Sequence, residues 1–327
     1  MIPTDIRLAT PADAPDLIRA IRACYGTSYL QPSALRGSRL AQDLADGSLV
    51  YAMARTEGRV VGQVALERLN QHGLYHHCRA VVSPGSRGQG LMRAMSAHLL
   101  RREAIPVDAQ LVLGTSVTSH TFTQRYNLRA GFTPLGLLLG VHPNQTLEDL
   151  PRMEEAGSAV LMALPLTAHW RPRHLALSGP ARRLASRVCG LLGIPLGSGS
   201  QLSTGSLWTQ WEEGPGGLWH LRYHPHPTTY GGPPVGAALE WVDVPAEHVA
   251  TPELLERWEG AGLSLAAYLP LAGPLGEDVI RLQRCRRSLT RSSIEVLEEI
   301  RPLRDWVFRL HSTTREPVSR LLDGVLR

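Results

Sequence analysis

Apolar and polar positions alternate through the first part of the chain in a way that predicts β-strands. Residues 5–9 alternate, and residues 48–54 and 60–69 flank the turn Glu57-Gly58-Arg59. Residues 74–82 form a further, mostly apolar run. Because a short turn joins two of these segments, the pattern predicts antiparallel strands that lead into residue 82.

Helical spacing separates these predicted strands. Thr10-Pro11-Ala12-Asp13 offers an N-cap residue followed by proline, which is typical of the start of a helix. A second, polar helix is expected to end near Leu44. Leu91, Met95 and Leu99 recur at a spacing of four and predict a helix that packs one face on a sheet.

The first part of the chain continues with predicted strands at 110–115, 135–140 and 160–164, a helix at 120–130 and a polar loop at 142–157.

The pattern changes after residue 168. All seven tryptophans lie from Trp170 to Trp306, which indicates a separate core. The elements predicted there are helices at 180–192, 251–260, 292–310 and 317–326, a Gly/Ser-rich linker at 193–205, and strands at 207–211, 218–223, 237–244, 264–269 and 278–282.

We therefore expect three parts: a first domain at 1–168, a helix and linker at 169–205, and a second α+β lobe at 206–327.

Composition excludes several classes of protein. The net charge is +5, all 34 basic residues are arginine, and the four cysteines are scattered singly without a Cys-x-x-Cys pair. A zinc site or disulfide framework is not expected, and no apolar run reaches the roughly 18 residues of a membrane span. With no signal peptide pattern, we expect a cytoplasmic protein. The densest basic run, Arg281 to Arg291, is more typical of a solvated linker than of a nucleic-acid surface.

The stretch from Arg79 to Met92 carries the strongest chemical signal. A short apolar strand and a Pro/Gly turn lead into Arg87-Gly88-Gln89-Gly90, which opens the helix that begins near Leu91. Glycines at such a turn let the backbone approach a ligand, and a helix N-terminus favours phosphate. The interpretation is a backbone cradle for a pyrophosphate with Arg87 as an added cation, and the alternative is a plain strand-to-helix turn.

The order Val82-x-Pro84-x-x-Arg87-Gly88-x-Gly90 resembles the acetyl-CoA loop of the GNAT N-acyltransferases, whose signature is Gln/Arg-x-x-Gly-x-Gly/Ala. Arg87 and Gly90 fill its first two positions, and Met92 stands at the last. Downstream, Ala130-Gly131-Phe132 resembles a second marker of the family. The resemblance covers roughly residues 4 to 168.

This resemblance implies an α/β (α+β) fold: a mixed, mostly antiparallel GNAT sheet flanked by helices. It also implies acetyl-CoA as cosubstrate, with no metal. Splayed strands would expose the backbone of Val81 and Val82 to the pantetheine arm. The expected cofactor-binding residues are Val81, Val82, Arg87, Gly88, Gln89, Gly90, Leu91, Met92 and Asn127. The second lobe is either a degenerate GNAT-like repeat without a cofactor loop or an unrelated α+β lobe.

Many family members place a general base on the strand that enters the cradle, six residues before the valine that meets pantetheine. That position is His76 here, and simple strand alternation predicts that it shares a face with Val82. His77 and Glu67 are further candidates. For the acid, Tyr126 lies one residue before the family's tyrosine position, which Asn127 occupies, and His120 is a third proton donor to consider.

The expected function is an acyl-CoA-dependent N-acyltransferase that moves an acetyl group to a primary amine by direct attack. The alternative is a non-catalytic acyl-CoA-binding or sensing module with a protein partner. The acceptor amine is not named by any motif, neither a membrane nor a nucleic-acid partner is expected, and a homo-oligomer stays open.

Overall fold

The computed structural model describes residues 4–26, 35–101, 103–142, 157–198, 201–214, 217–224 and 236–313. These fall into two compact units: the described residues up to Thr115 form unit 1, and those from Ser116 onward form unit 2. Each is a sheet of mostly antiparallel strands with helices on it, which confirms the expected fold class. The boundaries expected at 168 and 205 do not coincide with this division and stay predictions.

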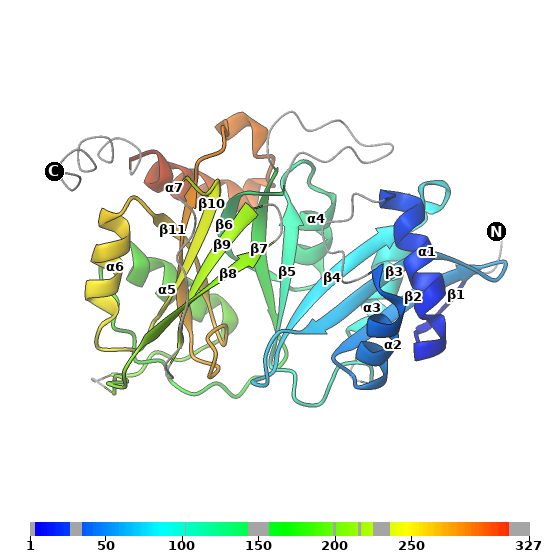
Figure 1. Ribbon diagram of the computed structural model, residues 1–327, viewed down its shortest axis with the longest axis horizontal. Helices are drawn as coiled ribbons and strands as arrows, with labels where there is room; N and C mark the ends of the chain where they lie inside the picture. Colours follow the sequence, from blue (N-terminus) through cyan, green and yellow to red (C-terminus); the bar gives the residue numbers. More distant parts are fainter. Residues whose placement is uncertain are drawn as a thin grey trace. The chain divides into compact units, whose positions relative to one another are not determined.

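The strands of unit 1 neighbour one another in sequence order (Figure 1). They are β1 (Asp5–Leu8), β2 (Leu49–Thr56), β3 (Arg59–Arg68), β4 (Leu74–Val82) and β5 (Leu111–Val117). All neighbours are antiparallel except β4 and β5, which run parallel. This arrangement confirms the predicted hairpin at Glu57-Gly58 and the predicted strand that enters the cradle.

Helices cover both faces of the unit 1 sheet. The short η1 (Pro11–Asp13) leads into α1 (Ala14–Tyr25), which packs with α2 (Gly37–Ala45) on one face through the core cluster Ala14, Leu17, Ile18, Leu40, Leu49, Tyr51, Met53, Ala65 and Cys78. On the other face lies α3 (Leu91–Leu99), where a Cβ added to Gly62 would lie 2.8 Å from Met95 Cε. The predicted stripe of α3 is buried as expected.

A strand irregularity interrupts β4 at Arg79. The register pairs Ala65 with Cys78 and Gln63 with Val81, so two residues of β4 stand opposite one residue of β3. Arg79 has φ +54°, a left-handed conformation that costs a non-glycine residue about 1–2 kcal/mol. Such a bulge reverses the alternation of side chains beyond it, so residues after 80 present faces opposite to those that simple alternation predicts.

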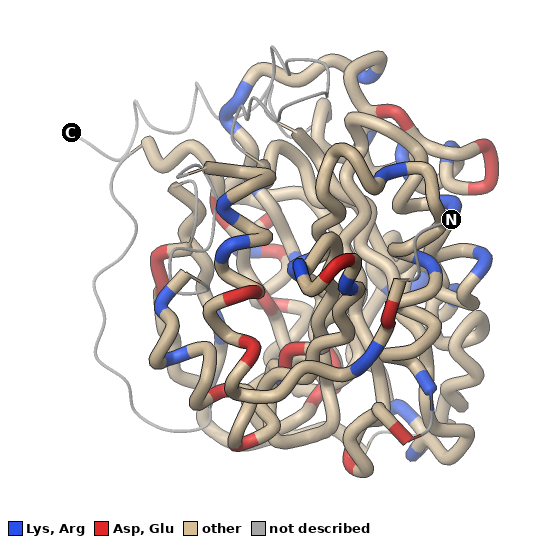
Figure 2. The backbone as a smooth tube through the Cα atoms, turned by 90° about the vertical axis from the view of Figure 1, so that its right-hand side faces the viewer, with Lys and Arg blue, Asp and Glu red and all other residues tan. Residues whose placement is uncertain are grey.

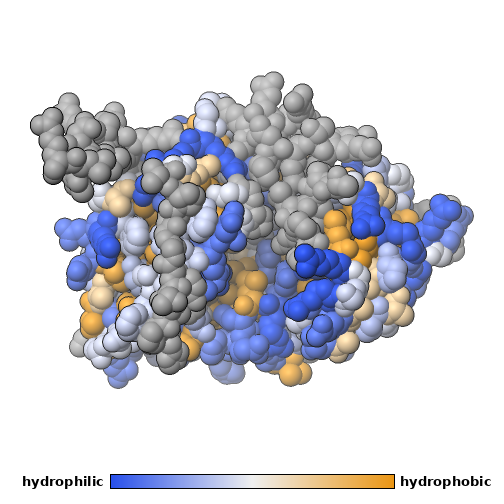
Figure 3. Space-filling view, viewed as in Figure 1, coloured by the Kyte–Doolittle hydropathy of each residue, from blue (hydrophilic) through white to orange (hydrophobic). Residues whose placement is uncertain are grey.

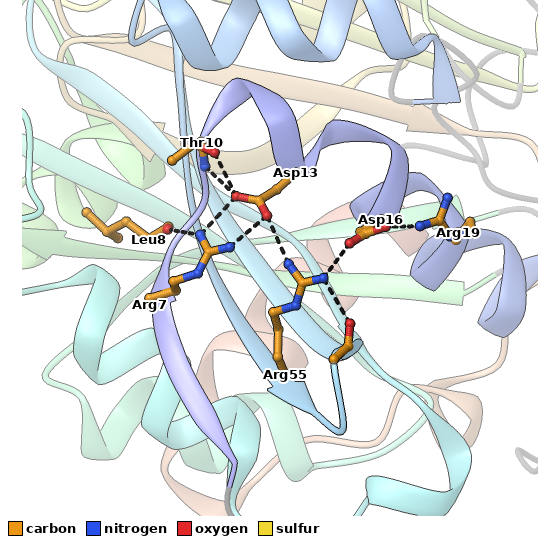
Figure 4. A network of polar contacts seen from close by, with 8 residues as sticks. Arg7, Leu8, Thr10, Asp13, Asp16, Arg19 and Arg55 are labelled. Atoms are coloured by element: carbon orange, nitrogen blue, oxygen red, sulfur yellow. Dashed lines mark hydrogen bonds and ion pairs between the residues drawn. The ribbon is translucent and has the colours of Figure 1, made fainter.

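The N-terminal corner of unit 1 is held by a buried carboxylate. Asp13 Oδ1 accepts from Arg7 Nη2 (2.7 Å) and Arg55 Nη1 (3.0 Å), and Asp13 Oδ2 accepts from the Thr10 backbone (2.8 Å) (Figure 4). Arg55 also reaches Asp16 at 2.6 Å. The bonds that Arg7 and Thr10 donate hold the pKa of Asp13 well below its usual range.

Replacing Asp13 with asparagine is therefore expected to lower the free energy of unfolding at pH 7 by about 1–3 kcal/mol. Because the folded-state pKa is depressed, this contribution is present above about pH 4 and is lost as the pH falls below it. Urea melts between pH 3 and pH 7 measure both effects. The matched control is Glu103→Gln, since Glu103 is an exposed carboxylate of the same unit; an equal loss in both variants would contradict this assignment.

In unit 2 the strands follow the order β7-β6-β11-β12-β10-β9-β8. They are β6 (Thr133–His142), β7 (Gly157–Pro165), β8 (Trp208–Gly214), β9 (Leu218–His224), β10 (Leu239–Pro245), β11 (Ser264–Leu269) and β12 (Val279–Cys285). The helices are α4 (Phe122–Arg129), α5 (Gly179–Leu192), α6 (Thr251–Gly260) and α7 (Arg301–Thr313).

The helix predicted over 292–310 is wrong in its first half. The short 3-10 turns η5 (Arg291–Ser293) and η6 (Glu298–Ile300) precede α7, which begins at Arg301. Pro302 explains the start, because proline has no N–H and its ring clashes with the carbonyl four residues earlier, so it is tolerated only in the first helical turn. The helix predicted over 317–326 and the core of the loop predicted over 142–157 lie outside the described residues.

The basic run from Arg281 to Arg291 is largely neutralised within unit 2. Arg281 pairs with Asp243, Arg284 and Arg286 lie 3.5 and 3.6 Å from Glu240, and Arg291 pairs with Asp305. Acidic and basic positions are interspersed along the described tube (Figure 2). Acidic partners within the lobe therefore offset much of the positive charge of this run.

The strands β8–β12 repeat the neighbour pattern of β3–β7. An antiparallel pair (β8, β9) corresponds to β3 and β4, and the parallel pair β9 and β10 corresponds to β4 and β5. The pairs β6–β7 and β11–β12 share a bulge at the third residue of their first strands, Leu135 and Ala266. The helices before them end alike, on Gly131 (φ +90°) and Gly262 (φ +86°).

The corresponding strands β6 and β11 also pair with each other. Gly136 and Ala267, which occupy the same place in the two patterns, face one another across this antiparallel contact. A Cβ on Gly136 would lie 2.4 Å from Ala267 Cβ, so only glycine fits.

On the face shown in Figure 3, hydrophilic residues are widespread, with apolar areas between them. Across the described residues, none of the helices has the length and apolar character to cross a membrane.

Candidate functional site

The loop between β4 and α3 leaves open space beside its backbone. After the short turn η3 (Pro84–Ser86), Gly88 and Gly90 both have φ +76°, a conformation in which glycine is strongly preferred. A Cβ added at either position would meet no atom within 4 Å. Residues 87–90 are exposed, so a ligand can reach this backbone directly.

The start of α3 adds unpaired donors to this loop. The first helical hydrogen bond runs from Ala94 N to Gly90 O. The N–H groups of residues 91–93 come before it and therefore have no acceptor within the helix. Leu91 is buried, so only its backbone faces the loop. Met92 is half-buried and its sulfur accepts from Ser96 Oγ at 3.8 Å, which turns the side chain along the helix. A methionine at the last signature position therefore leaves the loop open.

Two side chains fold back over the loop. The exposed Arg87 donates from Nε to Val82 O at 3.2 Å, and Gln89 Nε2 lies 3.4 Å from Gly85 O. The guanidinium of Arg87 is thus held at the end of β4, next to the backbone that the glycines expose.

The parallel strands β4 and β5 are paired over only part of their length. Register partners run from Leu74 with Leu111 to His77 with Gly114, whereas β4 continues to Val82 and β5 to Val117. Val81 packs with Ile21 and Cys24 of α1. The backbone of residues 78–82 therefore lies beyond the stretch that is paired with β5.

One face of the unit 1 sheet carries a group of polar side chains that we call the β4 polar cluster: Tyr51, Glu67, His76, Cys78, Arg79 and Thr115. His76 Nε2 lies 3.2 Å from Thr115 Oγ1. Glu67 accepts from Arg79 Nη2 at 2.9 Å and from the thiol of Cys78 at 3.5 Å. Arg79 Nη1 donates to Tyr51 Oη at 3.3 Å.

Burial decides the protonation of this cluster. Desolvation lowers the pKa of the half-buried His76, although nearby Glu67 opposes that effect. Desolvation and Glu67 raise the pKa of the Cys78 thiol far above its usual value. At neutral pH the cluster therefore presents a neutral imidazole and a protonated thiol.

The bulge corrects the predicted face of His76. Glu67, Ala65 and Gln63 alternate on one face of β3, and their register partners are His76, Cys78 and Val81. His76 consequently shares its face with Val81, whereas Val82 pairs with Gly62 on the opposite face. His77 points to the α3 side, where its ring lies 3.0 Å from Ser96 Oγ and burial lowers its pKa to about 4.

The predicted acid residues belong to α4, in unit 2. Tyr126 is half-buried, and Asn127 is buried with its Nδ2 donating to Ser116 Oγ at 2.8 Å. Asn127 Oδ1 is buried without a hydrogen-bond partner among the described residues. His120 precedes the helix, and desolvation lowers its pKa.

Three members of the β4 polar cluster could offer metal ligands. One donor atom from each of Glu67, His76 and Cys78 lies within 4.8 Å of the others. The Arg79 guanidinium, however, already neutralises Glu67, and the thiol is held protonated. This donor set fits an internal ion pair better than a bound cation.

A pocket of about 230 Å³ lies in unit 2 at the carboxyl ends of β9 and β10. Glu247, on its wall, accepts from Arg171 and from the His174 backbone, and His248 accepts from Ala250 N at 3.1 Å. None of the predicted site residues lines it. Two of its polar side chains, Glu247 and His248, are thus engaged in holding loops.

Sequence reasoning missed Tyr51, Arg79 and Thr115. Alternation along β2 places Tyr51 on the same face as Leu49 and Met53, so the face of this tyrosine could have been predicted from the sequence. The bulge at Arg79 and the register that brings Thr115 to His76 depend on strand pairing, which no local motif encodes.

One family model and several solved structures are similar to part of this chain. Residues 14–132 match the family model described as the acetyltransferase (GNAT) family. Similar solved structures include a ribosomal-protein-alanine N-acetyltransferase from Brucella melitensis (19% identity, 50% of this chain and 99% of that chain, TM-score 0.40). Another is a Salmonella typhimurium protein solved with its cofactor acetyl-CoA (16% identity, 52% and 98%, TM-score 0.42).

A third is an N-acetyltransferase from Staphylococcus aureus Mu50 (15% identity, 50% and 99%, TM-score 0.40). No curated protein matches the chain. The family match therefore identifies a GNAT acetyltransferase domain at residues 14–132 of this chain.

Proposed function

We propose that the chain is an acyl-CoA-dependent N-acyltransferase that transfers an acetyl group from acetyl-CoA to a primary amine by direct attack. One observation carries the proposal. The bulged strand β4 leaves its partner β5 after His77 and runs into a glycine loop with open space beside its backbone. These are the features that a thioester arm and a diphosphate need.

In this proposal the backbone of residues 88–92 and the guanidinium of Arg87 hold the diphosphate. Helix N-terminal N–H groups and a cation both favour a phosphate charge. The backbone of Val81 and Val82 meets the pantetheine arm, and Gln89 and Asn127 are further contacts. Among the described residues the buried Oδ1 of Asn127 has no hydrogen-bond partner, which is compatible with a polar ligand at α4.

His76 is the proposed general base. Attack on a thioester requires a neutral amine, and burial keeps this imidazole neutral at pH 7 so that it can accept the amine's proton. Cys78 argues against an acyl-cysteine intermediate, because its thiol pKa is raised by burial and by Glu67. Tyr126 is the proposed donor that protonates the departing thiolate.

A second candidate is an acyl-CoA-binding or sensing module. It is favoured by Asn127, which replaces the family's tyrosine and is bound to Ser116. An amide cannot readily give up a proton, so this position cannot act as an acid. In that case acetyl-CoA would bind without turnover.

Release of free CoA thiol from acetyl-CoA, measured across a panel of primary amines, separates the two functions. Amine-dependent release with acetylated product identified by mass would support the transferase. Saturable binding of acetyl-CoA by calorimetry without release on any amine would favour the sensing module. Absence of saturable binding would contradict both.

Charge reversal at Arg87 tests the cradle. We expect Arg87→Glu to weaken acetyl-CoA binding by about 1–3 kcal/mol, because a charge-assisted contact is replaced by repulsion. Calorimetric titration of the full chain measures the change. Arg59→Glu is the matched control, since Arg59 is an exposed arginine at the start of β3; equal weakening in both variants, or none in either, would remove Arg87 from the site.

A further inference from the structure

The repeated strand pattern places His220, in β8–β10, at the position that corresponds to His76 in β3–β5. His76 pairs in register with Glu67 on one side and with Leu113 on the other. In β8–β10, His220 pairs in register with Glu212 and Trp241. Each histidine is therefore the third residue of its strand, with a glutamate on the preceding strand opposite it.

Both histidines also bond to the same place on the next strand. Thr115 lies two residues beyond Leu113, and its Oγ1 is 3.2 Å from His76 Nε2. Asp243 lies two residues beyond Trp241, and its Oδ2 is 2.8 Å from His220 Nε2. The two sites thus share a Glu–His–partner arrangement and differ in whether the partner is neutral or charged.

The charged partner fixes the direction of the hydrogen bond. Asp243 is an ionised carboxylate, because Arg281 holds its pKa well below the usual range, and such a group only accepts. His220 Nε2 must therefore carry the proton. By the same geometry, the hydroxyl of Thr115 is placed to accept from His76 Nε2–H.

We propose that Thr115 is the positioning residue for His76: it accepts the Nε2–H bond, leaves the lone pair on Nδ1, and, being uncharged, lets the ring stay neutral. This proposal rests on the proposed function, in which His76 is the base. The site around His220 shows what the same arrangement gives when the partner, Asp243, is charged.

There Asp243 is clamped by Arg281 through two bonds of 2.7 Å, and both His220 and Asp243 are buried. Trp241, which replaces Leu113, stacks edge-on with His220. Arg281 lies over the same indole at 4.3 Å. The second histidine is consequently locked into a filled ion-pair network, whereas His76 is only half-buried.

Other groups around His76 also set its charge. The titratable and charged neighbours on its own face are Glu67 on β3, Cys78 and Arg79 on β4, and Tyr51 on β2, and His77 lies next to it on the opposite face of β4. Glu67 and Arg79 form an ion pair, so their effects on the imidazole largely oppose each other. The partner on β5 is thus the position at which one charge would change the ring most directly.

The proposal is tested by giving His76 the kind of partner that His220 has, an aspartate at the position of Thr115. The experiment uses the full chain labelled with ¹⁵N-histidine, and follows each imidazole by NMR from pH 4 to pH 9. Thr115→Asp is expected to raise the pKa of His76 by about one to three pH units, because a carboxylate within hydrogen-bond reach favours the imidazolium. The pH at which acetyl transfer reaches half its maximum should rise with it.

Asp243→Thr is the matched control: it should leave the titration of His76 in place and lower only the melting temperature. Thr115→Val should lose the Nε2–H tautomer signature of His76, and Thr115→Ser should restore it. A His76 titration unmoved by Thr115→Asp, or a tautomer unchanged by Thr115→Val, would overturn the proposal. Because the NMR readout needs no turnover, an inactive chain with these shifts would refute the proposed function and leave the positioning role standing.

Discussion

Replacing His76 with alanine is expected to lower kcat/KM for acetyl transfer about 10²–10⁴-fold, the usual contribution of a general base. The imidazole is half-buried, neutral at pH 7 and bonded to Thr115, so it can accept the proton of an attacking amine. Steady-state rates of CoA release measure the effect. Affinity for acetyl-CoA should hardly change, because the diphosphate loop does not use this side chain.

His72→Ala is the matched control. His72 is also half-buried, but it lies in the turn that precedes β4, and its backbone carbonyl accepts from Gln110 Nε2. Its replacement should leave kcat/KM within a factor of a few. Equal rates for the His76→Ala variant and the unaltered chain would exclude His76 as the base and direct attention to Glu67 or to water.

Replacing Gly90 with valine is expected to weaken acetyl-CoA binding at least about 100-fold, or roughly 2.7 kcal/mol. Two causes add. Gly90 has φ +76°, where a β-branched residue is strained, and its Cβ would enter the open space in which the diphosphate is proposed to lie. Calorimetric titration with acetyl-CoA measures the loss.

Gly58→Val separates these two causes. Gly58 has the same φ of +76° and equally open surroundings, but it lies in the β2–β3 turn. Both variants should lose stability to a similar extent, and only Gly90→Val should lose affinity. Equal affinity in the two variants would show that the loop does not hold the ligand.

The periodicity of apolar residues predicted α3 and β4, because each of these elements buries a regularly spaced or continuous set of apolar side chains. The spacing of Leu91, Met95 and Leu99 marks the face of α3 that lies on the sheet, and the apolar run of 74–82 gives β4 with the bounds that the structure shows. The glycine loop was also readable, because positive φ at Gly88 and Gly90 requires that residue type. These features depend on local sequence alone.

The orientation of the candidate base was not predictable in the same way. Strand alternation assigned His76 to the face of Val82, and the bulge at Arg79 reversed that assignment. The local sequence gives no sign of a bulge at this position, because arginine disfavours the φ of +54° that Arg79 adopts. The conformation is held by bonds from the Arg79 side chain to Glu67 and Tyr51, which come from two other strands.

The second lobe shows a similar limit. Its sequence suggested a degenerate repeat or an unrelated lobe with nearly equal weight, because it has no second glycine loop. The shared bulges at Leu135 and Ala266 and the matching helix ends at Gly131 and Gly262 are properties of register and backbone. They favour the repeat, and they became visible only once strands were paired.

A crystal structure of the full chain with acetyl-CoA tests the central claim most directly. We predict the diphosphate within hydrogen-bond distance of the backbone N–H groups of residues 88–92, and the pantetheine amides against the backbone of Val81 and Val82. A diphosphate bound elsewhere on the chain, or strands β4 and β5 paired along their whole length with acetyl-CoA present, would contradict it.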